Sequence, residues 1–243
     1  MPETTRIAMW SGPRNISTAM MRSWDSRADT EVMDEPFYAA YLATTGLDHP
    51  MRDAVIAGQP TDWQTVAETC ATCTGTPVIF QKHMSQHMVA EAPMDWVKDV
   101  RHAFLIRPPH EVAASFHQKW AEMGPEDLGF HRQAELFTEI ADLTGARPPV
   151  VLASDVLADP GSMLASLCAQ LGVAYDPAML AWAPGPRASD GVWAAHWYNA
   201  VEKSTGFAVP SPKPKADLPR ELDAIASACV PAFDTMMRHR LAA

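Results

Sequence analysis

Short apolar runs alternate along the chain with longer segments whose apolar residues recur at helical spacing. We expect each apolar run to form a strand and each longer segment to form one or more helices. The expected strands cover residues 7–10, 29–34, 76–81, 101–106 and 148–153. Strands that alternate with helices in this way are typical of a mostly parallel sheet with helices on both faces. The pattern therefore predicts an α/β fold.

Two of the expected helices have recognisable boundaries. Asp159 and Pro160 form a start signal for an amphipathic helix that ends at Gly172. A terminal helix is expected over residues 218–240, broken or kinked near Pro231, because a proline inside a helix removes a backbone donor. The other helices are expected over residues 16–22, 39–73 with a break near 58–60, and 110–120.

Residues 175–216 differ in composition from the rest of the chain, since they are rich in proline, glycine and tryptophan. A loop of this length inside a compact domain is usually functional or disordered, and its tryptophans favour a packed segment. Within it, residues 211–215 are expected to form an extended surface connector. No internal repeat or second domain is evident, so we expect residues 1–243 to form one domain.

The charge balance limits the partners that this chain is expected to bind. Hydrophobic residues make up 47% of the sequence, which is enough for a packed core, and the net charge is −10. A negative protein is a poor non-specific ligand for nucleic acids or for anionic membrane surfaces. If it binds an anionic molecule, it must gather its few cations in one place, so the position of each arginine and lysine is informative.

Signals for secretion, membrane insertion and metal binding are weak. No positively charged leader with an apolar core is evident, and no apolar run approaches 18 residues, so we expect a cytoplasmic protein. Cys70 and Cys73 have the C-x-x-C spacing, but no second cysteine pair follows, so we do not expect a zinc site.

The turn after the first expected strand has the composition of an anion-binding site. A strand, a tight turn and a helix together direct free backbone N–H groups and the positive end of the helix at an anion. Gly12 allows close approach to a ligand, and Pro13 fixes its own φ angle. Arg14 adds a cation, and Ser17 and Thr18 add hydroxyl donors. The turn lacks the lysine of a Walker A loop.

Further chemically active residues follow other expected strands. Glu35 precedes Pro36 at the exit of the second strand, Lys82 and His83 follow the third, and Arg107 follows the fourth. In an open parallel sheet these exits lie on the same edge, which is the usual ligand-binding side.

These motifs resemble those of the P-loop sulfotransferases, which use 3′-phosphoadenosine-5′-phosphosulfate as donor. In that family a Pro-Lys/Arg-Ser-Gly-Thr/Ser-Thr turn binds the 5′-phosphosulfate, and residues 13–18 match it in register. The family also binds the 3′-phosphate with an Arg-x-Pro segment and a serine eight residues after the arginine, which Arg107, Pro109 and Ser115 match. Residues 150–172 resemble the strand and Asp-Pro helix of the family, and residues 191–193 loosely resemble the loop that closes over the nucleotide.

The resemblance implies a three-layer P-loop fold and a set of site residues. The donor would contact Gly12, Pro13, Arg14, Asn15, Ile16, Ser17, Thr18, Arg107, Ser115 and Trp193. Asn15 and Ile16 replace the usual Ser-Gly pair, and a branched side chain at position 16 restricts the backbone there.

Two residues compete for the role of catalytic base. Glu35 resembles the carboxylate of the sulfotransferase branches that use glutamate at this place. Lys82 and His83 resemble the Lys-x-His of the cytosolic branch, with the intervening residue missing. We favour Glu35 because of its register, and His83 stays the alternative.

The expected reaction is transfer of a sulfuryl group to a hydroxyl or amine of a small acceptor, with a base to take the proton and cations to stabilise the transferred charge. Arg14 would neutralise the phosphosulfate, and no metal is expected in the family that the chain resembles. Two alternatives are a P-loop kinase that binds ATP and a nucleotide-binding module without turnover. The acceptor and the oligomeric state are not legible in the sequence.

Overall fold

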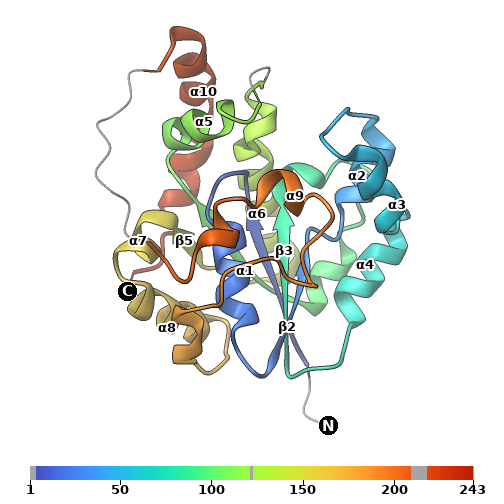
Figure 1. Cartoon of the computed structure of the whole chain (residues 1–243), viewed down its shortest axis with the longest axis vertical. Coiled ribbons are helices and arrows are strands. Elements are labelled where there is room, and N and C mark those ends of the chain that lie inside the picture. The colour runs from blue at the N-terminus through green and yellow to red at the C-terminus, as the bar shows by residue number, and fades with distance from the viewer. Residues whose placement is uncertain (1–3, 121–122, 209–217, 243) are drawn as a thin grey trace.

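A five-stranded parallel sheet forms the centre of the protein (Figure 1). The computed structural model describes residues 4–120, 123–208 and 218–242. The strands are β1 (Thr5–Ser11), β2 (Thr30–Asp34), β3 (Val78–Met84), β4 (Arg101–Ile106) and β5 (Val150–Leu152), in the spatial order β2-β3-β1-β4-β5. All four strand pairings are parallel, which confirms the predicted α/β class.

Helices cover both faces of this sheet. The α-helices of the described ranges are α1 (Ser17–Asp25), α2 (Tyr38–Thr45), α3 (Arg52–Gly58), α4 (Trp63–Thr72), α5 (Pro109–His117), α6 (Phe130–Thr144), α7 (Ala153–Ala158), α8 (Pro160–Gln170), α9 (Ala194–Trp197) and α10 (Arg220–Met237). Short 3-10 helices are η1 (Ser85–His87), η2 (Asp95–Asp99), η3 (Glu126–Leu128), η4 (Pro177–Leu180) and η5 (Val201–Lys203). Helices α1, α2, α7 and α8 pack on one face, and α4 and α6 pack on the other.

The alternation of side chains along β1 shows how the two cores are separated. Ile7 and Met9 belong to the core under α1 and α8, whereas Ala8 and Trp10 belong to the core under α4 and α6. Trp24 of α1 stacks on Phe80 of β3 with ring centroids 5.0 Å apart. Full burial of a side chain such as Phe80 stabilises the fold by about 1.5–3 kcal/mol. A strand buried on both faces explains why β1 is an almost continuous apolar run in the sequence.

Some predicted boundaries differ from the observed ones. β3 continues to Met84, so Lys82 and His83 lie inside the strand rather than after it, and adjacent strand residues point to opposite faces. β5 covers only Val150–Leu152 of the strand predicted over 148–153, and Ala153 already begins α7. The terminal helix α10 continues through Pro231, so the break predicted there does not occur.

The described part of the proline- and tryptophan-rich segment, residues 175–208, is packed, as its tryptophans suggested. Trp182 and Trp193 are buried, and Trp197 packs partly buried against the core. The expected connector at 211–215 lies outside the residues that the structure describes.

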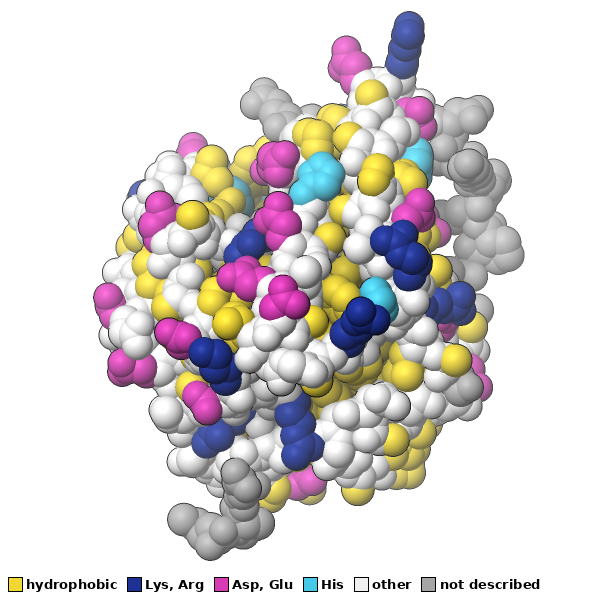
Figure 2. Space-filling model, turned by 180° about the vertical axis from the view of Figure 1, so that it is seen from behind, with side chains coloured by type: hydrophobic (Ala, Val, Ile, Leu, Met, Phe, Trp, Pro, Cys, Tyr) yellow, Lys and Arg dark blue, Asp and Glu magenta, His cyan; other side chains and the backbone are white. Residues whose placement is uncertain are grey.

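On the face of the molecule in Figure 2, acidic and basic side chains are interspersed rather than gathered by sign. No helix in the described ranges combines the length and the apolar character that crossing a membrane requires.

Candidate active site

The carboxyl edge of the sheet opens into a cavity of about 610 Å³. Its walls come from the turn after β1, the start of α1, the ends of β2 and β3, helices α2 and α5, and residues 197–208. The predicted site residues that line it are Pro13, Arg14, Asn15, Ile16, Ser17, Thr18, Glu35, Lys82, Arg107 and Ser115. The structure thus brings both phosphate motifs and the favoured base into one cavity, whereas Gly12, His83 and Trp193 do not line it.

The turn after β1 has an unusual backbone. Arg14 and Ile16 both have positive φ angles, 59° and 57°, which is the left-handed region that favours glycine. Ile16 precedes α1 directly, and no side chain caps that helix. The first residues of α1 line the cavity, so the unpaired N–H groups of its first turn are available to an anion there.

Two guanidinium groups meet at this turn. Arg14 Nε donates to Ser115 Oγ at 3.0 Å, and Arg107 Nη1 donates to the carbonyl oxygen of Arg14 at 3.0 Å. Burial, and then the charge of Arg107, lower the pKa of Arg14. Arg107 Nε also donates to Glu111 at 2.9 Å, the one ion pair that either arginine forms among the described residues. This end of the cavity therefore carries positive charge that a phosphate group would compensate.

Gly12 and Asn15 position the turn from behind. A Cβ atom on Gly12 would lie 2.6 Å from the carbonyl oxygen of Leu128, so glycine is required there for packing against η3. The sequence predicts glycine at position 12 so that a ligand can approach closely. The contact with Leu128 gives a second reason for glycine there, which is packing. Asn15 Nδ2 donates to the carbonyl oxygen of Leu105 at 3.2 Å, which ties the turn to β4.

The other end of the cavity is built around Lys82. Its ammonium group donates to the Glu35 carboxylate, to Asp34 Oδ1 at 2.9 Å and to the Tyr198 hydroxyl at 2.8 Å. The Tyr198 hydroxyl in turn donates to Asp34, with its oxygen 2.7 Å from Oδ2. Lys82, Asp34, Glu35 and Tyr198, which we call the lysine cluster, are all buried.

Glu35 is placed by the exit of β2. Its backbone N–H donates to the carbonyl oxygen of Lys82 at 2.9 Å, so it continues the sheet by one hydrogen bond before Pro36 turns the chain into α2. Its carboxylate pairs with Lys82, the residue that precedes His83 in β3.

Burial and the neighbouring charges together set the pKa values of Glu35 and Lys82. Burial raises the pKa of Glu35 to about 7, although the charge of Lys82 acts in the opposite direction. Burial also opposes the charge on Lys82, yet the carboxylates of Asp34 and Glu35 outweigh it and hold the pKa of Lys82 above its ordinary value. A carboxyl group that titrates near neutral pH is well matched to the work of a general base.

His83 lies on the opposite face of β3. Its ring stacks on Trp10 with centroids 4.5 Å apart, and its Nε2 lies 3.0 Å from Gln81 Oε1. Burial lowers the pKa of His83 to about 3. In a Lys-x-His pattern both side chains share one face of a strand, so the missing residue turns this histidine away from Lys82. The structure therefore brings Glu35 to the cavity and keeps His83 out of it.

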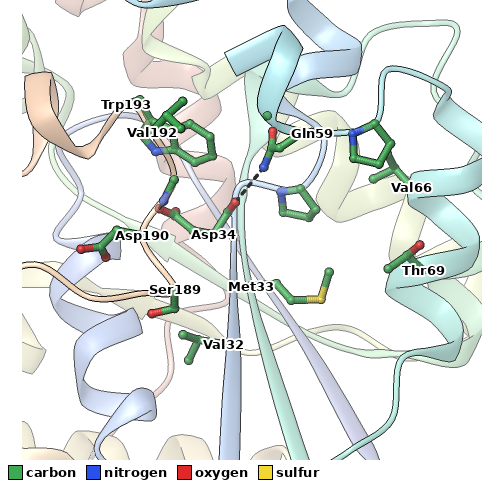
Figure 3. Close-up of a pocket in the computed structure, with 14 residues that line it drawn as sticks. Val32, Met33, Asp34, Gln59, Val66, Thr69, Ser189, Asp190, Val192 and Trp193 are labelled. Atoms are coloured by element: carbon green, nitrogen blue, oxygen red, sulfur yellow. Dashed lines mark hydrogen bonds between the residues drawn. The ribbon is translucent and has the colours of Figure 1, made fainter. Parts of the chain in front are cut away.

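Trp193 supports the lysine cluster from a second, smaller cavity. Its side chain is 1% exposed, and its Nε1 donates to the Tyr198 hydroxyl at 3.2 Å. Figure 3 shows Trp193 and Asp34 on the wall of this smaller cavity, whose volume is about 340 Å³. Asp34 Oδ2 accepts the backbone N–H of Gly191 at 3.1 Å, which fixes the loop that carries Trp193. The expected contact of Trp193 with the nucleotide stays a prediction, and in the structure its indole positions Tyr198.

Sequence reasoning missed Tyr198 and assigned no role in the site to Asp34. Asp34 carried a signal, because it directly precedes Glu35 at the end of an expected strand. Tyr198 carried none, since it reaches Asp34 from 164 residues away. A buried ion pair between Arg22 and Asp190, 2.6 Å apart, anchors the same loop to α1.

Comparison with known proteins identifies the family. A sequence model of the sulfotransferase domain matches residues 5–240. The chain therefore belongs to the sulfotransferase domain family, which places it among the transferases of that class.

Two proteins of Arabidopsis thaliana are similar in sequence. They are named branched-chain-amino-acid aminotransferase-like proteins 2 and 1, and the chain is 32% and 34% identical to them over 96% and 88% of its length. The chain spans only 41% and 39% of these relatives.

Solved structures of similar fold are sulfotransferases or domains of that kind. They include the domain of the curacin biosynthetic pathway (TM-score 0.53, 16% identity), covering 95% of this chain and 99% of that one. The domain of the Synechococcus PCC 7002 olefin synthase has a TM-score of 0.54 at 16% identity, covering 94% and 95%. A sulfotransferase from Alicyclobacillus acidocaldarius has a TM-score of 0.57 at 13% identity, covering 98% of each chain. At these identities the likeness concerns the fold, and it agrees with the predicted three-layer P-loop architecture.

Proposed function

We propose that this protein transfers a sulfuryl group from 3′-phosphoadenosine-5′-phosphosulfate to a hydroxyl group of a small acceptor, within the 610 Å³ cavity. One observation carries the proposal. Arg14 and Arg107 lie at an uncapped helix N-terminus, and the same cavity contains the Glu35 and Lys82 pair. The first group suits an anionic donor, and the second suits removal of a proton.

The arginines fit a nucleotide that carries phosphate at two positions. Arg14, Ser17 and Thr18 would bind the 5′-phosphosulfate together with the backbone N–H groups of the first turn of α1. Arg107 and Ser115 would bind the 3′-phosphate. The hydrogen bond between Arg14 and Ser115 joins the two subsites, so that a donor with both groups would neutralise both guanidiniums.

When bound, the donor supplies a sulfur atom whose bond to the bridging phosphate oxygen breaks as the acceptor oxygen bonds to it. Glu35 accepts the proton of the acceptor hydroxyl, because its carboxylate lines the cavity and titrates near neutral pH. Arg14 stabilises negative charge on the sulfuryl and leaving phosphate oxygens, while Lys82, whose three N–H donors go to Asp34, Glu35 and Tyr198, positions the Glu35 carboxylate. The Asp34 and Tyr198 contacts hold the Lys82 ammonium in place during the transfer.

An ATP-dependent kinase is the main alternative enzyme. It fits less well, because the turn has no Walker A lysine. A binding module without turnover is favoured by one feature, the branched Ile16 at a left-handed position.

A ligand panel tests the proposal. Calorimetry should show tighter binding of 3′,5′-diphosphoadenosine than of AMP or of ATP with Mg²⁺, and Arg107→Ala should remove most of the preference over AMP. Equal affinity of the parent protein for 3′,5′-diphosphoadenosine and AMP would refute the proposed donor. If the protein binds 3′,5′-diphosphoadenosine but transfers a sulfuryl group to no acceptor, the binding module without turnover is the better description.

A further inference from the structure

Part of the cavity has an aromatic wall that the proposed mechanism does not use. It consists of Tyr38 and Tyr41 from α2, His49, His87 from η1, and Trp120, all of which line the cavity. Tyr38 and Tyr41 stack on His87 with centroids 4.5 and 4.8 Å away, and His49 meets Trp120 edge-on at 4.9 Å. The Tyr38 hydroxyl lies 3.0 Å from His49 Nδ1, which closes the wall on itself.

The charges next to this wall are mostly negative or paired. The neighbouring cavity that shares His49 and Trp120 is lined by Asp48, by Asp53 with its partner Arg52, and by Lys119. Asp127 lines the same cavity and forms no ion pair within the described ranges, although its Oδ2 accepts the backbone N–H of Gly124 at 2.7 Å. Burial, and then the carboxylate of Asp127, raise the pKa of Tyr41 to about 12, so the two groups are close in space. Lys82 is the basic group that acts on Tyr38, and its charge is already shared by Asp34 and Glu35.

The two histidines of the wall add no positive charge. Burial lowers the pKa of His49 and holds that of His87 well below its ordinary value, so both are neutral at pH 7. His87 also has an unused polar atom, since its side chain is buried and its Nδ1 has no hydrogen-bond partner among the described residues. Its Nε2 is 3.9 Å from Glu35 Oε2, next to the base. A buried polar atom without a partner beside a cavity indicates a polar ligand group there.

We propose that the acceptor is a small alcohol with a permanent or protonated ammonium group, held by this aromatic wall and by Asp127. The inference rests on the proposed function. Faces of tyrosine and tryptophan attract cations, and carboxylates without partners of opposite charge do the same. The hydroxyl oxygen forms the new bond to sulfur as the bond between sulfur and the phosphate oxygen of the donor breaks. The nucleotide leaves as 3′,5′-diphosphoadenosine, the hydroxyl gives its proton to Glu35, and the ammonium group keeps its charge. A cation near Glu35 would in addition favour the ionised carboxylate that the reaction needs.

Two matched pairs of probes test the charge directly. The full chain, saturated with 3′,5′-diphosphoadenosine, is titrated with choline and with its uncharged isostere 3,3-dimethylbutan-1-ol, and then with ethanolamine and 1-propanol. We expect the cation of at least one pair to bind about tenfold or more tightly than its neutral partner, the scale of a desolvated cation–π contact. Equal or tighter binding of both neutral members would overturn the inference, and so would absence of binding by all four probes.

Two variants locate the cation. Asp127→Asn keeps an acceptor for the Gly124 N–H and removes the charge, so it should weaken binding of the cation about fivefold and leave the neutral isostere unchanged. Glu126→Gln is the matched control, because Glu126 is exposed on the same turn and does not line the cavity. Trp120→Leu should also reduce the preference for the cation. Equal effects of Asp127→Asn and Glu126→Gln would place the cation elsewhere.

The outcome separates this inference from the proposed function. The same four probes are also titrated into the chain without nucleotide, so that cation binding is measured independently of donor binding. Cation binding by a chain that does not bind 3′,5′-diphosphoadenosine would refute the proposed donor and leave the aromatic wall as a cation site. Nucleotide binding and sulfuryl transfer without any preference for the cation would refute this inference alone.

Discussion

At one end of the cavity Arg14 has no carboxylate partner among the described residues and Arg107 has one, Glu111, whereas at the other end Lys82 lies between two carboxylates. The arginine end is partly exposed and rests on backbone geometry, while the lysine cluster is buried and rests on side-chain hydrogen bonds. Charge without a partner at a cavity surface is suited to binding an anion. Charge that is paired and buried is suited to setting a pKa. Under the proposed function the two ends divide donor binding from proton transfer, and each variant below should affect one of these more than the other.

The largest effect is expected at the base. Glu35→Gln keeps the shape of the side chain and removes its basicity, so turnover should fall by about 10²–10⁴-fold, the usual range for loss of a general base. Affinity for 3′,5′-diphosphoadenosine should change little, because Glu35 pairs with Lys82 rather than with an arginine. Turnover with a proven acceptor and calorimetry of the nucleotide measure the two effects separately.

His83→Asn is the informative control for the base. Because His83 points away from the cavity, its loss should reduce turnover only as far as it reduces folding, which thermal unfolding measures. The opposite pattern, near-parental turnover in Glu35→Gln and its loss in His83→Asn, would show that the cytosolic-type assignment is right.

The difference between the two ends also explains which residues of the cavity could be predicted from the sequence. Arg14, Arg107 and Glu35 each lie at or shortly after the end of an expected strand, and the rule that parallel strands end on one edge was enough to bring them together. The roles assigned to them stay predictions. The five strands were likewise predicted, because a parallel sheet buried on both faces leaves continuous apolar runs.

What the sequence concealed depends on contacts between distant segments. β3 extends two residues beyond Lys82, so Lys82 and His83 point to opposite faces of the sheet and only Lys82 faces the cavity. The ends of strands are poorly predicted from local sequence pattern. Tyr198 follows a loop that the ion pair between Arg22 and Asp190 anchors to α1. The spacing of apolar residues in the sequence does not predict this ion pair.

A smaller effect is expected at the arginine end. Arg14→Ala should weaken binding of 3′,5′-diphosphoadenosine by about 1.5–3 kcal/mol, the scale of a charge-assisted hydrogen bond. Because the lysine cluster does not contact Arg14, the pH dependence of turnover should keep its shape. Unchanged affinity by calorimetry would remove the turn from the binding site.

The pH dependence tests the lysine cluster without abolishing it. Burial, with a contribution from the neighbouring charge of Asp34, raises the pKa of Glu35 to about 7, so turnover of the parent protein should rise with pH through about 7 as the base ionises. Asp34→Asn removes a negative charge and thereby favours ionised Glu35. Its rising limb should therefore move to lower pH.

A merely structural role for Asp34 predicts a different profile. Loss of its contacts with Lys82 and Tyr198 would lower turnover at every pH and leave the midpoint of the limb unchanged. A midpoint that moves upward in Asp34→Asn would contradict the electrostatic assignment.

The smallest effect concerns the backbone at Ile16, where the arginine end departs from the Ser-Gly of the family that the turn resembles. At a φ of 57° a residue with a Cβ atom costs about 1–2 kcal/mol relative to the right-handed region, and glycine avoids most of this cost. Ile16→Gly and Ile16→Ala both lose the packing of the branched side chain, so their difference isolates the backbone. Glycine normally destabilises a folded chain relative to alanine, because it is freer when unfolded. Here the order should reverse, with Ile16→Gly more stable than Ile16→Ala by up to about 1 kcal/mol in denaturant unfolding. If Ile16→Ala proves the more stable variant, the left-handed turn is absent in solution and the anion site at α1 loses its geometric basis.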